Sequence, residues 1–182
     1  MPYSVSKSIV FVGMMGAGKS AIGRTLAERL SLPFVDSDGA IEAAANLKIS
    51  EIFEKFGEPF FREKEMQVVR RLVEGDLQVL ATGGGAYSQA ETRTIIDNAA
   101  LSVWLNADLE TIWNRVKGKT HRPLLQTENP RKVLEDMMEK RLPDYQNAAV
   151  HITVDAENSI DDTTDLVIKQ LLEQGVIKEV LT

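Results

Sequence analysis

The sequence contains no cysteine. Disulfide bonds, thiolate metal sites and cysteine nucleophiles are therefore excluded. No apolar run approaches the roughly 20 residues that a membrane-spanning helix needs. We expect the first strand to begin by about residue 8, which leaves no room for a signal peptide. These absences predict a soluble protein of the cytoplasm.

Positive charge is also in deficit, because 21 lysines and arginines face 27 acidic residues and give a net charge of −6. This balance argues against nucleic acid or an anionic membrane as the main partner. An anionic small molecule stays compatible with it if arginines gather in one cleft. The chain has 182 residues, of which 43% are apolar, and shows no internal repeat. We therefore expect a single domain with a proper core.

Residues 13–20 read Gly-Met-Met-Gly-Ala-Gly-Lys-Ser and fit the phosphate-loop pattern G-x-x-x-x-G-K-[ST] at every specified position. The surroundings agree, since residues 9–12 are typical of a buried strand and residues 22–30 carry apolar side chains at helical spacing. Glycines let backbone N–H groups turn toward an anion. Lys19 can then reach the outer phosphates, and Ser20 can ligate Mg²⁺. The stretch predicts binding of a nucleoside triphosphate.

Strands alternate with helices along the rest of the chain. Besides residues 9–12, strands are expected at residues 32–36, 78–82, 101–105 and 150–154. Because strand–helix–strand units close by right-handed crossovers, this order predicts an α/β fold with a five-stranded parallel sheet flanked by helices.

Two insertions are expected in this sheet framework. Residues 39–73 are mostly helical by pattern, with a helix start at Ser50 and a break at residues 57–59. Residues 116–129 form a polar loop long enough to act as a mobile lid. The helix after it begins at Asn129-Pro130 and is ended by Pro143, with Leu134, Met138 and Leu142 as its buried stripe.

Two carboxylates, Asp36 and Asp38, stand at the end of the second expected strand. The strand ending at Thr82 offers no aspartate for the metal shell that a phosphate loop needs. Because residues two apart point the same way with one between them, we assign Asp36 to the metal and Asp38, further out, to the acceptor. The alternative is a pair of aspartates that only form a turn or cap a helix.

Three consecutive glycines, at positions 83–85, follow the next strand. In an open α/β sheet this position lies at the ligand-binding edge. Backbone N–H groups of glycine can approach a small polar ligand closely because no side chain intervenes. The alternative is a loop that is merely tight.

Several arginines are candidates for binding anions. Arg62 follows the break at residues 57–59 and could hold a carboxylate with both arms of its guanidinium, or form a surface ion pair with Glu58 or Glu65. Arg141 either lies along the edge of its helix or faces a cleft. Arg122 in the expected lid could close over a transferring phosphate, or stay solvated.

Taken in order, these motifs resemble those of the shikimate kinases over about residues 8–172. The resemblance rests on residues 13–20, 36–38, 57–62, 80–85 and 122–125, and on Arg141 with Tyr145. It implies a P-loop kinase fold and transfer of the ATP γ-phosphoryl group to the 3-hydroxyl of shikimate, with Mg²⁺ as cofactor. It also implies a monomer whose partners are small molecules, with no nucleic acid and no membrane.

The resemblance also implies roles for single residues. The catalytic residues would be Lys19, Asp38 and Arg122. Nucleotide contacts would come from Gly16, Ala17, Gly18, Lys19, Ser20, Ala21, Arg115, Arg122 and Asn158. The acceptor would be held by Asp38, Arg62, Gly83, Gly84, Gly85 and Arg141, and the metal by Ser20 and Asp36.

Other functions fit parts of the pattern. A gluconate or nucleoside monophosphate kinase could share the fold, and gluconate also carries a carboxylate, although the Ala-Thr-Gly-Gly-Gly run at 81–85 favours shikimate. A GTP-dependent switch would need an Asn-Lys-x-Asp motif, which the sequence does not contain. A degenerate kinase fold that only binds ligands is disfavoured, because the sequence keeps the phosphate-loop residues, both aspartates and the lid arginine.

Overall fold

A computed structural model describes residues 3–119 and 126–180. Its centre is a five-stranded parallel sheet with β2 (Ser8–Val12) in the middle. β4 (Val79–Ala81) and β5 (Ala100–Asn106) flank β2, while β3 (Phe34–Asp36) and β6 (Val150–Thr153) form the edges. All four neighbouring pairs are parallel. The predicted α/β fold and five-stranded sheet are confirmed.

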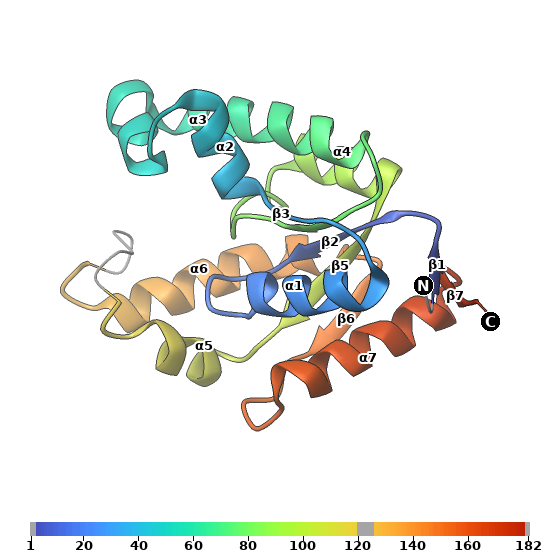
Figure 1. Ribbon diagram of the computed structural model, residues 1–182. Coiled ribbons are helices and arrows are strands. Elements are labelled where there is room, and N and C mark those ends of the chain that lie inside the picture. Colours follow the sequence, from blue (N-terminus) through green and yellow to red (C-terminus); the bar gives the residue numbers. More distant parts are fainter. Residues whose placement is uncertain (1–2, 120–125, 181–182) are drawn as a thin grey trace.

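Helices cover both faces of this sheet (Figure 1). α1 (Lys19–Leu30) and α7 (Ile160–Glu173) pack against each other on one face. α4 (Ala90–Ala99) contacts β5, and α6 (Pro130–Tyr145) packs beside α5 (Leu109–Val116). Because both faces are covered, every residue of β2 is buried.

α2 (Ser37–Ala45) and α3 (Ile49–Val73) pack together as the predicted helical insertion (Figure 1). α3 begins one residue before the expected start at Ser50. It bends at Gly57, whose φ of 81° and ψ of 173° are not helical. The break expected at residues 57–59 is therefore confirmed, and it gives the two halves of α3 different directions.

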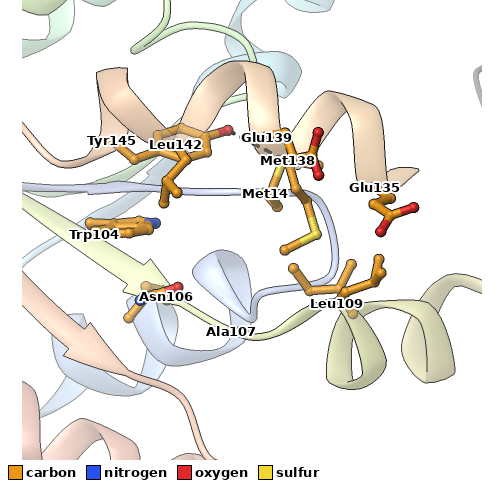
Figure 2. A pocket seen from close by; sticks show the side chains of 12 residues that line it. Met14, Trp104, Asn106, Ala107, Leu109, Glu135, Met138, Glu139, Leu142 and Tyr145 are labelled. Atoms are coloured by element: carbon orange, nitrogen blue, oxygen red, sulfur yellow. Dashed lines mark hydrogen bonds between the residues drawn. The ribbon is translucent and has the colours of Figure 1, made fainter. Parts of the chain in front are cut away.

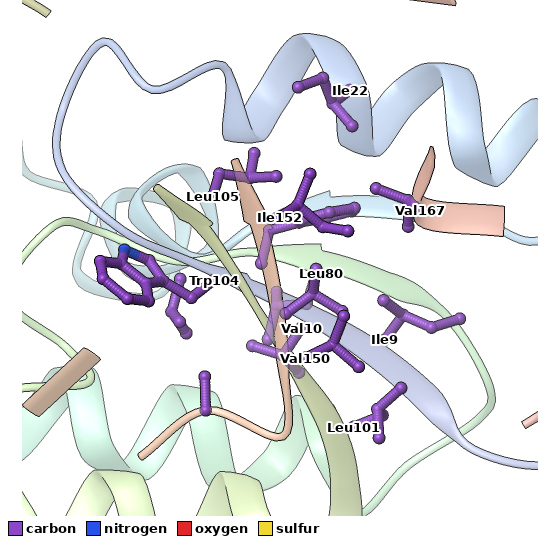
Figure 3. Packing of buried hydrophobic residues seen from close by; sticks show 14 of the residues in the cluster. Ile9, Val10, Ile22, Leu80, Leu101, Trp104, Leu105, Val150, Ile152 and Val167 are labelled. Carbon is purple, nitrogen blue, oxygen red and sulfur yellow. The ribbon is translucent and has the colours of Figure 1, made fainter. Parts of the chain in front are cut away.

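The main core lies between the sheet and its helices (Figure 3). Ile9 and Val10 of the central strand meet Leu80 on one neighbour and Leu101 on the other. A smaller cluster around Ile41, Ile52, Phe61 and Val68 holds α2 against α3. The insertion thus has apolar packing of its own.

Three expectations are corrected. Pro143 lies inside α6 instead of ending it, because the helix continues to Tyr145, whose ring packs on Trp104. Leu142 is 41% exposed, so the buried stripe of α6 runs from Leu134 to Tyr145. The first strand is not β2 but β1 (Tyr3–Val5), which pairs with β7 (Ile177–Glu179) in a separate antiparallel ribbon. No helix within the described ranges is long and apolar enough to cross a membrane.

Candidate active site

The phosphate loop connects β2 to α1 at the carboxyl edge of the sheet. Gly18 caps α1 with a φ of 101°, a conformation that side-chain-bearing residues rarely adopt. No side chain caps the first turn of α1 and none there is acidic, so its N–H groups suit a phosphate. The buried Lys19 ammonium donates to the carbonyls of Gly13 (2.7 Å) and Met14 (2.8 Å). The loop therefore holds its cation in a defined place.

Ser20 and Asp36 lie side by side, as expected for a shared metal shell. The Ser20 hydroxyl donates to Asp36 Oδ2 at 3.1 Å, and Asp36 Oδ1 accepts the Asp38 N–H at 2.9 Å. Asp36 is therefore also the N-cap of α2. The described residues contain no group of three or more His, Asp or Glu that could hold a metal alone. The pair of hard oxygens fits Mg²⁺, which commonly takes one or two protein oxygens together with phosphate.

The three glycines after β4 each lie against one predicted acceptor residue. A Cβ added at Gly83 would stand 2.8 Å from Asp38 Oδ1. One at Gly84 would stand 3.0 Å from Arg141 Nη1, and one at Gly85 would stand 2.5 Å from Arg62 Nη2. Any side chain here would push these groups aside. The structure thus brings the predicted acceptor residues together, and the glycines make room for them.

Arg62 is held by a buried carboxylate. Its Nη1 donates to Glu65 Oε1 at 2.8 Å, while its Nε lies 3.4 Å from the exposed Glu58. Glu65 is only 1% exposed. Of the two surface ion pairs considered for Arg62, the pair with Glu58 is at the surface, whereas the pair with Glu65 is buried.

Burial sets the charge balance of the site. Desolvation raises the pKa of Asp38, the negative charge of Asp36 raises it further, and Lys19 and Arg62 oppose the shift. Desolvation also raises the pKa of Glu65 against the pull of Arg62. A carboxylate with a raised pKa is a better proton acceptor, so Asp38 is suited to take a proton from a bound hydroxyl.

Arg141 faces the site from α6. Its Nη1 lies 3.9 Å from the Met14 sulfur, in addition to its contact with Gly84. Tyr145, one turn further along α6, donates its hydroxyl proton to the Gly84 carbonyl. The same hydroxyl points toward Met14 (Figure 2). Sequence reasoning used Tyr145 only as part of a motif and missed this contact, because its partners lie 61 and 131 residues away.

The other residues predicted to contact the nucleotide lie in different parts of the structure. Arg115 is exposed on α5 and donates to the Gly16 carbonyl at 3.0 Å, so it lies at the outer edge of the phosphate loop. Ala21 is exposed in the first turn of α1. Asn158 lies in the turn before α7, and its N–H donates to Asp155 at 3.2 Å. Within the described residues no hydrogen bond joins Asn158 to the phosphate loop. Arg122 lies outside the described residues.

A separate cavity of 250 Å³ lies behind the phosphate loop between α5 and α6 (Figure 2). Its wall is mostly apolar and includes Met14, Trp104, Met138 and Leu142. None of the predicted acceptor residues lines it.

The fold and the site together define a phosphate-loop kinase. A parallel sheet presents a glycine-rich loop with lysine and serine, and Asp36 beside that serine. Next to them, three glycines lie against Asp38, Arg62 and Arg141.

The model of the family described as shikimate kinase matches residues 15–174. A shikimate kinase of Ruegeria pomeroyi is 49% identical over 176 residues, which cover 97% of this chain and 90% of the relative. One of Caulobacter vibrioides is 52% identical over 147 residues, covering 81% and 74%. The solved shikimate kinase of Acinetobacter baumannii in complex with shikimate has a TM-score of 0.86 at 38% identity, covering 92% of this chain and 94% of that one. The chain belongs to the shikimate kinase family, whose members are ATP-dependent kinases.

Proposed function

We propose that this protein transfers the γ-phosphoryl group of ATP to the 3-hydroxyl of shikimate. The observation that carries the proposal is the set of three glycines packed against Asp38, Arg141 and Arg62. Two guanidinium groups suit a carboxylate, and Asp38 suits hydroxyls. A relative whose structure was solved with shikimate supports this acceptor.

The nucleotide side of the reaction belongs to the phosphate loop. Backbone N–H groups at the start of α1 and the Lys19 ammonium would bind the outer phosphates. Mg²⁺ belongs to the same proposal, since Ser20 and Asp36 would hold it and it would offset charge on the phosphate oxygens. These residues supply position and charge, which are what phosphoryl transfer chiefly needs.

On the acceptor side, Arg62 and Arg141 would hold the carboxylate and so fix the ring. Asp38 would accept the proton of the 3-hydroxyl while the oxygen of that hydroxyl bonds to the γ-phosphorus. The bond from that phosphorus to the bridging oxygen breaks at the same time, and ADP leaves. Arg122 as a cation over the phosphates stays a prediction from the sequence.

The direct test is ADP release with a panel of shikimate, gluconate and nucleoside monophosphates. We expect turnover with shikimate and none above the ATPase background with the others. Phosphorylation of gluconate in preference to shikimate would overturn the proposal. A monomeric state and a cytoplasmic location belong to the same proposal, and sedimentation and cell fractionation test them.

The acceptor arginines give a sharper test through Arg62→Lys. Lysine keeps the charge but loses the planar fork that bonds both carboxylate oxygens. We expect shikimate affinity to fall at least about tenfold, with ATP affinity within about twofold of the wild type. Arg131→Lys, an exposed arginine paired with Glu110, is the control. Titrations of each ligand separately measure this, and equal losses for both ligands would remove Arg62 from the acceptor site.

A further inference from the structure

The hydroxyl of Tyr145 is placed to control the backbone of the glycine loop. Tyr145 is the last residue of α6 and is only 2% exposed. Its hydroxyl reaches the Gly84 carbonyl and lies 3.6 Å from the Met14 sulfur. Both partners can only accept, and a carbonyl oxygen is a stronger acceptor than a thioether sulfur, so the one hydroxyl proton is donated to Gly84.

That hydrogen bond orients the central peptide of a turn, which the Ala86 N–H closes by donating to the Gly83 carbonyl at 3.2 Å. The Gly84 carbonyl and the Gly85 N–H belong to one planar trans peptide, so they point in opposite directions. Within the described ranges, no protein group accepts a hydrogen bond from the Gly84 or Gly85 N–H. Glycine on both sides leaves the peptide easy to rotate. Holding the carbonyl at Tyr145 turns the Gly85 N–H to the opposite side.

Tyr145 itself is rigidly supported. Its ring stacks on Trp104 of β5 with centroids 5.9 Å apart, and the two rings lie together in Figure 2. The preceding residue, Asp144, pairs with Arg93 of α4 at 3.3 Å. Burial raises the pKa of Tyr145 to about 12, so the hydroxyl keeps its proton at physiological pH. The ring stacking and the neighbouring ion pair therefore hold the hydroxyl donor in place.

We propose that Tyr145 is a positioning residue for the acceptor, which acts by orienting the Gly84–Gly85 peptide as an N–H donor toward the acceptor's anionic group. The inference rests on the proposed function, because the glycine loop serves the acceptor there. Tyr145 does not touch the reacting atoms. Its hydroxyl meets the acceptor side through the Gly84 carbonyl and meets the phosphate loop only through the side-chain sulfur of Met14, so its effect falls on acceptor binding.

Tyr145→Phe removes only the hydroxyl and keeps the ring stacked on Trp104. We expect the KM for shikimate to rise about three- to tenfold, the size expected for losing one neutral hydrogen bond. The KM for ATP and kcat at saturating shikimate should stay within about twofold, because binding alone is weakened. Calorimetric titration of shikimate should show the same loss in affinity.

Tyr87→Phe is the matched control. Tyr87 is fully buried, and its hydroxyl donates to Asp97 at 2.8 Å, on the side of α4. The same chemical group is lost there without touching the glycine loop. We expect Tyr87→Phe to lower Tm while the KM for shikimate stays at the wild-type value.

Three results would decide against the inference. An unchanged shikimate KM in Tyr145→Phe would overturn the positioning role and leave the proposed function standing. A lower Tm with no kinetic change in both variants would do the same, since it would make both hydroxyls merely structural. A wild-type protein that does not phosphorylate shikimate would overturn both proposals.

Discussion

The ammonium group of Lys19 is anchored by two carbonyls of its own loop. Lys19→Ala removes this cation but not the backbone N–H groups that shape the loop. We expect kcat to fall about a hundredfold or more, because charge on the transferring group is no longer offset. Coupled ADP assays measure this loss, and Lys178→Ala on β7 is the exposed control. Transfer within a few-fold of the wild type would refute the phosphate-loop assignment.

The burial of Asp38 in the site lowers the stability of the fold when its carboxyl group is ionised. Its pKa is raised in the folded state, chiefly by burial. A carboxyl group with a raised folded-state pKa stabilises the fold only while protonated, so this contribution is lost as pH rises through the folded-state pKa. Ionising Asp38 therefore costs more free energy in the folded protein than in the unfolded chain, where water solvates the carboxylate.

Asp38→Asn tests this cost, because asparagine keeps the shape and removes the charge. We expect Tm at pH 7 to rise by a few degrees while kcat falls by orders of magnitude. The gain in Tm should shrink as the pH is lowered, because the wild-type aspartate then takes up a proton and also becomes neutral. Thermal melts across this pH range give the comparison. A Tm below the wild type at every pH would show that Asp38 is a net stabilising group.

The site residues that could be predicted from the sequence are those that belong to a short local motif. Lys19, Ser20, Asp36 and Asp38 each sit beside a strand end that the apolar pattern predicts. Glu65 was visible only as a possible ion-pair partner, because nothing local shows that it is buried. The contact from Tyr145 to Gly84 depends on how α6 crosses the sheet, and spacing along the chain does not encode that.

Among the elements, α3 depends on one residue for its shape. Gly57 has a φ of 81° and a ψ of 173°, a region that is open almost only to glycine. A Cβ there would meet only Pro59, at 3.8 Å, so any cost of substitution is conformational. The bend lies five residues before Arg62, and it sets the direction from which the guanidinium enters the site.

Gly57→Ala should therefore cost about 1–3 kcal/mol and lower Tm by about 2–12 °C. The KM for shikimate should rise more than the KM for ATP, because Arg62 shifts with its half of α3. Gly39→Ala in α2 is the control, since a Cβ there meets nothing within 4 Å and φ is not positive. That variant should keep its Tm or gain slightly. Equal melts for the two variants would mean that the bend is not held by Gly57.

Element prediction succeeded where periodicity was long and failed where it was short. The helix that begins at Asn129-Pro130 was found because proline suits a first turn and apolar residues follow at helical spacing. The end of α6 was misplaced because packing of Tyr145 on Trp104 keeps the helix going past Pro143. β1 and β7 have three residues each and mix polar with apolar side chains, whereas the equally short β3 and β4 lie in mostly apolar runs.

At the scale of the whole molecule, the net charge is negative, but positive side chains gather at the proposed active site. The chain carries a net charge of −6, yet Lys19, Arg62 and Arg141 converge on the carboxyl edge of the sheet. Asp38 and Glu65 lie among these cations. An anionic nucleotide and an anionic acceptor can therefore be drawn to one place on a molecule that otherwise repels them.

The ribbon of β1 and β7 provides a test that separates stability from activity. Ile177 is 1% exposed, belongs to the main core and pairs with Val5. The ribbon lies at the end of the molecule that holds both termini, away from α5 (Figure 1). Ile177→Ala should cost about 2–5 kcal/mol and lower Tm by roughly 4–20 °C, while kcat and both KM values below the melt stay at wild-type levels. Lys178→Ala, on the exposed face of the same strand, should leave both Tm and the kinetic constants unchanged. A fall in kcat for Ile177→Ala, at a temperature where the variant is folded, would show that the ribbon is coupled to the active site.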